Sequence, residues 1–189
     1  RPASTWSIAT DAGFVIGIDL LVETALVAVA RVDGEIVATE LVGDIPLESG
    51  DRLAALSSII ERQSTANGPA LGPLRALTIS TTGTVDAEGT VMDSTSIPSW
   101  AGFPLGGKLG DHFGLPVRIE NDINASAYGE FVLRCSEGQL EDNDDLLLVA
   151  LSRSVLTGLV MGGQIHRGRG FNAGEIGVIE AVAGGRGLE

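Results

Sequence analysis

Residues 115–130 read Leu115-Pro-Val-Arg-Ile-Glu-Asn-Asp-Ile-Asn-Ala-Ser-Ala-Tyr-Gly-Glu130, a pattern that predicts a buried strand leading directly into a helix. The strand covers residues 117–120, and the helix opens at Asp122 with a face of small residues that permits close packing. Asn121 and Asp122 are therefore expected beyond the carboxyl end of a strand, the usual ligand position in open α/β sheets. For an isolated Asn-Asp pair, the preferred interpretation is a helix N-cap.

Hydrophobic periodicity elsewhere predicts an α/β protein whose first unit has the element order βββαβαβ. Asp33-Gly34 is the expected hairpin turn between the second and third strands. Apolar residues from Leu53 to Ile60 predict a helix that ends before Gly68-Pro69. The remaining elements are strands at residues 14–20, 25–32, 35–41, 74–80 and 117–120, and a short helix at residues 105–113.

A second, similar unit is expected to begin at the Asp122 helix. Residues 145–151 and 156–161 predict two strands joined through Ser152-Arg-Ser154, but the chain stops before such a unit could be completed. We therefore expect a complete first lobe at residues 14–121 and a truncated second lobe at residues 122–189. Between the Asp122 helix and the next strand, an acidic stretch is expected to form a solvated loop.

Composition limits the function classes that this chain can serve. With 12 Lys and Arg against 25 Asp and Glu, the formal net charge is −13, which argues against direct binding to a nucleic-acid backbone. The single Cys135 excludes an internal disulfide and is expected to be a core thiol. No apolar run approaches the ~20 residues of a membrane span, so we expect a soluble, cytoplasmic protein without membrane partners.

Four further motifs surround Asn121-Asp122 in a characteristic order: Val15-Ile-Gly-Ile-Asp-Leu20, Thr82-Gly-Thr-Val-Asp86, Ser94-Thr-Ser-Ile-Pro-Ser-Trp100 and Ala173-Gly-Glu-Ile-Gly177. In order and spacing they resemble the ROK family of bacterial repressors and sugar kinases. The resemblance implies an α/β protein with the actin-like ATPase (ribonuclease-H-like) fold. The start Arg1-Pro2-Ala3 is similar to the segment that follows the winged helix-turn-helix of family repressors, so residues 1–13 are expected to be a linker after a DNA-binding domain absent from this chain.

Both phosphate-binding turns of the family are altered. Family kinases carry Asp-Leu-Gly-Gly-Thr after the first strand, where this chain has Asp19-Leu-Leu-Val-Glu-Thr24. Their second turn, Gly-Thr-Gly-Ile-Gly-x-Gly, is replaced by Ser152-Arg-Ser-Val-Leu-Thr-Gly158. Branched side chains block the approach of backbone N–H groups to ATP, and Glu23 would repel it. We expect no cofactor, although Arg153 could bind a phosphate or merely pair with the acidic loop.

The resemblance also implies sugar-binding positions, which in this chain are Gly83, Ser96, Asn121, Asp122 and Glu175. Ser96 replaces an Asn of the family, and Asp122 occupies the position of the general base in kinases. The structural zinc of the family lacks its ligands here, because Val178 replaces the His and no cysteine follows in residues 178–186, so no metal is expected. Leu188-Glu189 matches either the family's Gly-Cys-Leu-Glu or a cloning remnant.

These features favour the sugar-sensing and oligomerisation region of a ROK-type transcriptional repressor, without catalytic activity. The expected effector is a sugar or sugar phosphate, the expected assembly is a homodimer, and DNA would be bound only through the absent N-terminal domain. Two alternatives are a ROK sugar kinase with an altered ATP site and a structural dimerisation lobe without a ligand.

Overall fold

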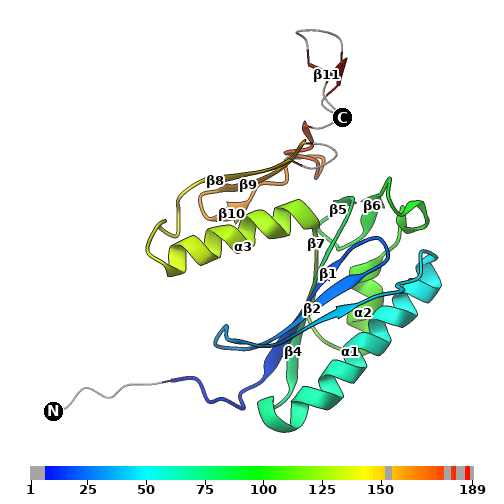
Figure 1. Cartoon of the computed structure of the whole chain (residues 1–189), viewed down its shortest axis with the longest axis vertical. Helices are drawn as coiled ribbons and strands as arrows, with labels where there is room; N and C mark the ends of the chain where they lie inside the picture. Colours follow the sequence, from blue (N-terminus) through cyan, green and yellow to red (C-terminus); the bar gives the residue numbers. More distant parts are fainter. Residues whose placement is uncertain (1–6, 152–154, 177–179, 182–185, 188–189) are drawn as a thin grey trace, which may run out of the picture. The chain divides into compact units, whose positions relative to one another are not determined.

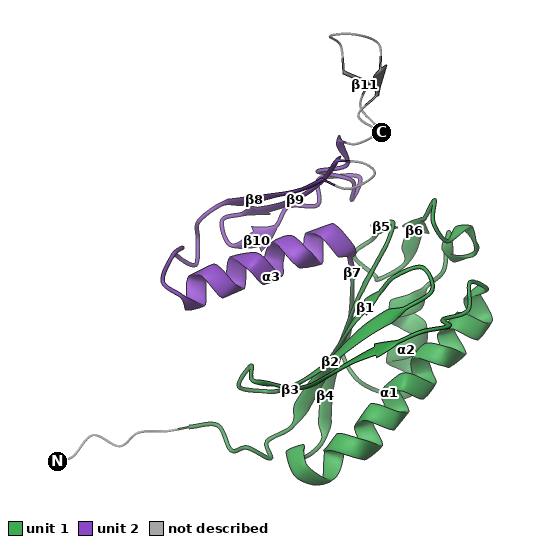
Figure 2. Cartoon of the chain, in the orientation of Figure 1, with its two compact units in different colours: residues 1–120 green, residues 121–189 purple. Residues whose placement is uncertain are grey.

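The chain is divided into two structural units, residues 1–120 and residues 121–189, which are coloured green and purple in Figure 2. The computed structural model describes residues 7–151, 155–176, 180–181 and 186–187. Among these residues, no helix is both long and apolar enough to cross a lipid bilayer.

The first unit is built on a five-stranded sheet in the order β3-β2-β1-β4-β7. Strand β1 runs antiparallel to β2 and parallel to β4. The bounds are β1 Phe14–Leu20, β2 Ala25–Arg31, β3 Ile36–Val42, β4 Leu74–Thr81 and β7 Val117–Asn121. With helices α1 (Ser49–Leu71) and α2 (Leu105–Phe113), the principal elements confirm the predicted order βββαβαβ.

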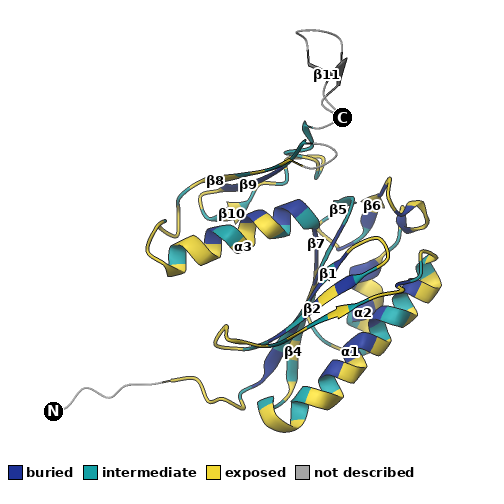
Figure 3. Ribbon diagram, in the orientation of Figure 1, coloured by how far each residue is buried: buried dark blue, intermediate teal, exposed yellow. Residues whose placement is uncertain are grey.

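One face of this sheet is covered by α1 and α2 (Figure 1). Alternation places Phe14, Ile16, Ile18 and Leu20 of β1 in the core, each at most 3% exposed. Leu56 and Ile60 of α1 lie in the same core, and Figure 3 shows the buried side of α1. Each fully buried aliphatic side chain contributes about 1.5–3 kcal/mol, so this layer supplies most of the unit's stability.

Helix α1 extends beyond its predicted end. We expected it to end before Gly68-Pro69, but it continues to Leu71, with Pro69 inside its last turn. That prediction was wrong because tertiary packing outweighs the local penalty of proline: Leu71 packs against the core. The helix then ends at Gly72, whose N–H donates to the carbonyl of Gly68 at 2.9 Å.

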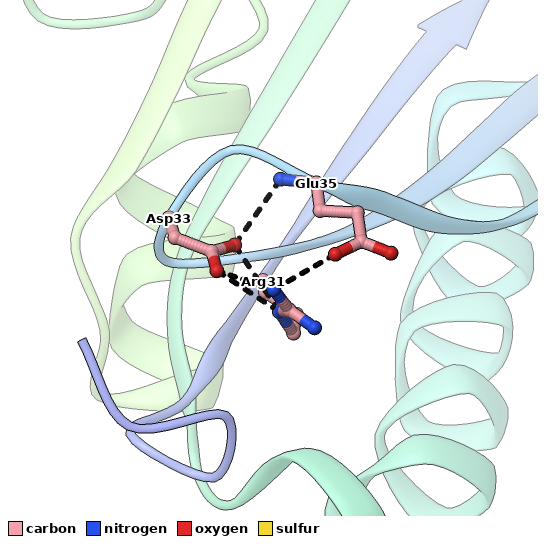
Figure 4. Close-up of polar contacts among 3 residues, drawn as sticks. All are labelled: Arg31, Asp33 and Glu35. Atoms are coloured by element: carbon pink, nitrogen blue, oxygen red, sulfur yellow. Dashed lines mark hydrogen bonds and ion pairs between the residues drawn. The ribbon is translucent and has the colours of Figure 1, made fainter. Parts of the chain in front are cut away.

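The predicted hairpin turn at Asp33-Gly34 joins β2 to β3 (Figure 4). The Arg31 guanidinium hydrogen-bonds the Asp33 carboxylate and pairs with Glu35 at 2.8 Å. Hydrogen bonding from Arg31 lowers the pKa of Asp33. Because these groups are exposed to solvent, they define the turn more than they stabilise the fold.

Several short elements were not predicted. They are β5 (Thr84–Val85), β6 (Val91–Asp93), the 3-10 helix η1 (Pro98–Trp100), β10 (Gln164–Ile165), β11 (Glu180–Ala181) and β12 (Arg186–Gly187). Each has only two or three residues, too few for a hydrophobic period to be recognised. The strands among them depend on pairing partners, as in the antiparallel pairing of β5 with β6.

The second unit packs helix α3 (Asp122–Ser136) against a three-stranded sheet in the order β10-β9-β8. The two predicted strands are present as β8 (Leu146–Leu151) and β9 (Val155–Met161), and they pair antiparallel. Residues 152–154, which join them, lie outside the described residues. Ala127, Phe131 and Val160 form its small core, and the partly buried Cys135 packs against them. Burial and nearby acidic residues raise the pKa of Cys135, which disfavours its reactive thiolate.

Gly158 of β9 sets how closely α3 approaches the sheet. A Cβ atom at this position would lie 2.5 Å from the carbonyl oxygen of Ile123 and 2.6 Å from the Cβ of Ala127. Only a residue without a side chain therefore fits here. Gly158 is also the one glycine retained from the second phosphate turn of the family, so its retention has a packing explanation.

We predict that Gly158→Ala destabilises the protein by roughly 2–3 kcal/mol, because the added methyl group must push α3 away from β9. Gly129→Ala is the matched control: it also adds one methyl group, but a Cβ at Gly129 on α3 meets nothing within 4 Å. The free energy of unfolding of this control should rise by about 0.5–1 kcal/mol, because alanine has a better helix propensity than glycine. Urea denaturation followed by circular dichroism measures both, and equal effects of the two substitutions would contradict the packing argument.

Candidate functional site

The junction of β7 and α3 places the Asn-Asp pair. Asn121 is only 6% exposed, and its side-chain oxygen accepts a hydrogen bond from the N–H of Asn124 at 3.1 Å. Asn121 is therefore the N-cap of α3, which confirms the capping interpretation for this residue. Asp122 follows in the first turn, where its carboxylate accepts from the N–H of Ile123 at 2.7 Å and is favoured by the helix dipole.

Asp122 and Glu175 are brought together within the second unit. Burial, and secondly the charge of Asp122, raise the pKa of the Glu175 carboxyl group. The segment before Glu175 is held by Thr157 of β9, whose hydroxyl donates to the carbonyl of Gly174 at 2.6 Å. Two neighbouring carboxyl groups accept hydrogen bonds from hydroxyl groups, and they disfavour an anionic group at the same place.

The two remaining predicted positions, Gly83 and Ser96, belong to the first unit. Gly83 lies between β4 and β5 with φ +98°, and a Cβ there would lie 2.1 Å from the carbonyl oxygen of Asp93. This backbone conformation requires glycine whatever the residue binds. Ser96 is exposed on the loop between β6 and η1, next to the buried Ile97.

The β1–β2 turn is a closed hairpin, unlike an open, glycine-rich phosphate-binding turn. The N–H of Leu21 donates to the carbonyl of Thr24 at 2.9 Å, which closes a two-residue hairpin. The side chains of Leu21 and Val22 are 45% and 39% exposed at its surface. At the end of β1, Asp19 accepts a hydrogen bond from the Ser80 hydroxyl at 2.7 Å. The second altered turn falls partly on residues 152–154, including Arg153, outside the described residues.

One residue near this turn was missed by sequence reasoning. Arg52 is completely buried, and its guanidinium donates to the carbonyl oxygens of Leu21, Val22 and Pro46. A detectable signal existed, because Arg52 shares the apolar face of α1 with Leu56. A charged residue on such a face is a sign of a specific buried partner.

The described residues contain no group of three or more His, Cys, Asp or Glu side chains that could hold a metal ion. The positions on which the zinc argument rests, Val178 and residues 184–185, are not among them. His112 is exposed and pairs with Glu61 at 3.2 Å. The absence of zinc therefore stays a prediction from the missing ligands.

Glu175 should make stability depend on pH. Its pKa in the folded protein lies above the ordinary value of 4.5, so its contribution to stability is complete below that pH and is lost as pH rises through the folded pKa. Glu175→Gln stays neutral, and its stability relative to the wild type should therefore improve between about pH 4 and pH 7. Denaturation across this range measures the difference.

Asp122→Asn provides the internal control for this pH dependence, since it removes the second cause of the raised pKa and leaves burial in place. In this variant the pKa of Glu175, followed by carboxyl-carbon NMR, should fall toward its ordinary value. A constant stability difference between wild type and Glu175→Gln across the whole range would contradict the assignment.

Comparison with known proteins relates the chain to both repressors and sugar kinases. It is 27% identical over 169 residues to the xylose repressor of Caldicellulosiruptor bescii, an alignment covering 88% of this chain and 41% of that protein. A ROK family glucokinase from Streptomyces griseus, solved with glucose and AMPPNP, is 30% identical with a TM-score of 0.73, covering 90% of this chain and 51% of the kinase.

A ROK family transcriptional regulator, homologous to the E. coli MLC protein, has the same fold with a TM-score of 0.79 at 22% identity. This match covers 93% of the chain and 45% of the regulator, so the chain spans about half or less of each of these relatives. Together with the sheet order, these similarities show that the chain has the actin-like ATPase (ribonuclease-H-like) fold. Since the model of the ROK family matches residues 15–186, nearly the whole chain, this protein belongs to the ROK family.

Proposed function

We propose that the chain is the sugar-sensing and oligomerisation region of a ROK-family transcriptional regulator and that it has no catalytic activity. Residues 1–13 then serve as the linker from a DNA-binding domain, and the protein acts in the cytoplasm as a homodimer. The effector is a sugar or a sugar derivative. Similarity to a xylose repressor and to a ROK transcriptional regulator supports this role.

The observation that carries the non-catalytic assignment is the closed β1–β2 turn. Phosphate binding at such a turn needs several backbone N–H groups that point to one open space. In this chain the N–H of Leu21 is bonded within the turn, and Arg52 binds the carbonyl oxygens of Leu21 and Val22. Glu23, also in the turn, adds a negative charge where a polyphosphate would approach.

Sugar recognition is supported by the carboxyl groups of the second unit. We propose that Asp122 and Glu175 accept hydrogen bonds from the ligand's hydroxyl groups. Asn121 would contribute through its side-chain amide, whose oxygen also caps α3. The contributions of Gly83 and Ser96 remain predictions from the family resemblance.

A sugar kinase is the second candidate, because the chain is 30% identical in sequence to the Streptomyces griseus glucokinase. Asp122, which the family resemblance places at the position of the kinases' general base, is present. An assay of ATP-dependent phosphorylation with glucose, mannose and N-acetylglucosamine distinguishes the candidates. We expect no turnover above background, and turnover abolished by Asp122→Ala would establish the kinase.

Asp122→Asn should weaken sugar binding by roughly 10- to 100-fold, because it replaces a charged hydrogen-bond acceptor with a neutral one. Its melting temperature should change little, since Asn121 and not Asp122 caps α3. Calorimetric titration of the full-length protein with xylose, glucose, mannose and N-acetylglucosamine measures the affinity.

Glu130→Gln is the control for this experiment. It also removes one carboxylate charge from α3, but the Glu130 carboxylate forms a salt bridge on the surface of α3, 2.7 Å from the guanidinium of Arg134. This control should bind sugar like the wild type. If a sugar binds and Asp122→Asn binds it equally well, Asp122 is a structural residue. If no sugar binds at all, the dimerisation lobe without a ligand becomes the better description.

A further inference from the structure

Helix α3 has an uncharged side that is turned away from its own core. Ala127 and Phe131 bury the opposite side of the helix against Val160 of β9, and Figure 3 shows the exposed parts of α3 in yellow. Residues three or four positions apart share one side of a helix. We call the uncharged side the outer face of α3, and its residues are Ala125, Ser126, Gly129, Val132, Leu133 and Ser136. The solvent side of a surface helix normally carries charged residues, and none of these six is charged.

Large and small residues are separated along the outer face. Its C-terminal half exposes two aliphatic side chains, since Val132 is 48% and Leu133 is 52% exposed. Its N-terminal half has only the small residues Ala125 and Ser126. Between the halves lies Gly129, where a Cβ atom would meet nothing within 4 Å. Adjacent exposed apolar side chains on a helix are typical of an interaction surface.

The hydroxyl groups of the outer face are already hydrogen-bonded within α3. The Ser126 hydroxyl donates to the carbonyl of Asp122 at 2.9 Å. The Ser136 hydroxyl donates to the carbonyl of Leu133 at 2.7 Å. Both hydroxyls would keep these partners if the outer face were covered, so the usual cost of burying a polar group does not arise.

We propose that the outer face of α3 is the surface at which two copies of this chain associate, with their α3 helices packed antiparallel about a two-fold axis at Gly129. Position 125 of one copy then lies opposite position 133 of the other, and position 126 lies opposite position 132. Leu133 packs on Ala125 of the second copy. Val132 likewise packs on Ser126, so that large side chains meet small ones, as close packing requires.

This self-complementarity holds for the antiparallel pair alone. Two parallel α3 helices in register would place Leu133 against Leu133 and Ala125 against Ala125, which leaves a gap at one end and crowding at the other. At the axis, the two Gly129 residues let the helices approach to the lower limit of about 8 Å between helix axes. The contact rests on the proposed function, of which the homodimer is a part, and it names the surface that forms that dimer.

Charge restricts where two copies can meet. Each copy has a formal net charge of −13, so two copies repel each other unless the contact is free of charged groups. Beside the outer face, the Glu130 carboxylate pairs with Arg134 at 2.7 Å. In the antiparallel pair it lies opposite the exposed Tyr128 of the second copy, whose hydroxyl can donate to it. One helix pair is a small interface, so the dimer should dissociate at micromolar concentrations.

Gly129→Leu tests the contact at the axis in the full-length protein. The protomer should still fold, because a Cβ at Gly129 meets nothing within 4 Å and leucine has a higher helix propensity than glycine. Two leucines would collide at the axis, whereas alanine would still fit between helices about 8 Å apart. The dissociation constant of the dimer, measured by sedimentation velocity, should therefore rise roughly 10-fold or more.

Gly107→Leu is the matched control, since Gly107 is an exposed glycine of α2 at which a Cβ also meets nothing within 4 Å. This variant should associate like the wild type. Circular dichroism of both variants verifies that each protomer keeps its helices.

The pairing of position 125 with position 133 has a separate test. Leu133→Glu should weaken association, because it places a carboxylate in an apolar contact, and Ala125→Lys should do the same. In the double variant each lysine lies opposite a glutamate of the second copy, so it should associate more tightly than either single variant, and more so at low salt. Within one helix the two positions are eight residues apart, too far to pair with each other.

A dimeric wild type whose dissociation constant is the same in Gly129→Leu and Leu133→Glu would overturn the α3 contact and leave the proposed homodimer intact. A double variant that associates no more tightly than the single variants would overturn the antiparallel arrangement. A wild type that stays monomeric up to about 100 μM would overturn both the homodimer and this contact, and would assign the outer face to another part of the same protein.

Discussion

The close contact between α3 and β9 is the constraint on which the candidate site depends. Helix and strand meet at Gly158, where even a methyl group would collide with the backbone of Ile123. This contact fixes the position of the first turn of α3 and hence the position of the Asp122 carboxylate. The adjacent Thr157 holds the carbonyl of Gly174 and so places Glu175. One short piece of strand therefore positions both carboxyl groups, and their proximity is a consequence of packing.

Two of the retained glycines show why a family motif is an ambiguous guide to function. Gly83 and Gly158 both match motif positions, yet each is required for steric reasons. Gly83 has φ +98° and lies against the carbonyl of Asp93, and Gly158 lies against the backbone of Ile123 in α3. A chain that loses nucleotide binding still needs these residues to fold. Motif positions in the β1–β2 turn, by contrast, have changed.

Most of the fold could be predicted because periodicity is a local property of the sequence. The bounds of β1 and α2 were predicted without error, since alternation in one and helical spacing in the other reflect burial of one face. The end of α1 was not, because packing of Leu71 opposes the local signal of Pro69. The burial of Arg52 on the apolar face of α1 could have been detected, but its partners could not, because backbone carbonyl groups carry no residue identity.

The function proposed for this chain separates recognition of a sugar from reaction with ATP. Recognition needs hydroxyl acceptors, and the Asp122–Glu175 pair can provide them without any other group bound. Phosphoryl transfer needs, in addition, N–H groups open to a polyphosphate, and in the β1–β2 turn the closed hairpin and Glu23 oppose this. Because charge repulsion acts on the anionic nucleotide and not on a neutral sugar, an acidic chain can lose the first ligand and keep the second. A guanidinium ordering the turn from inside the core is consistent with that separation, since no external phosphate is then needed to hold it.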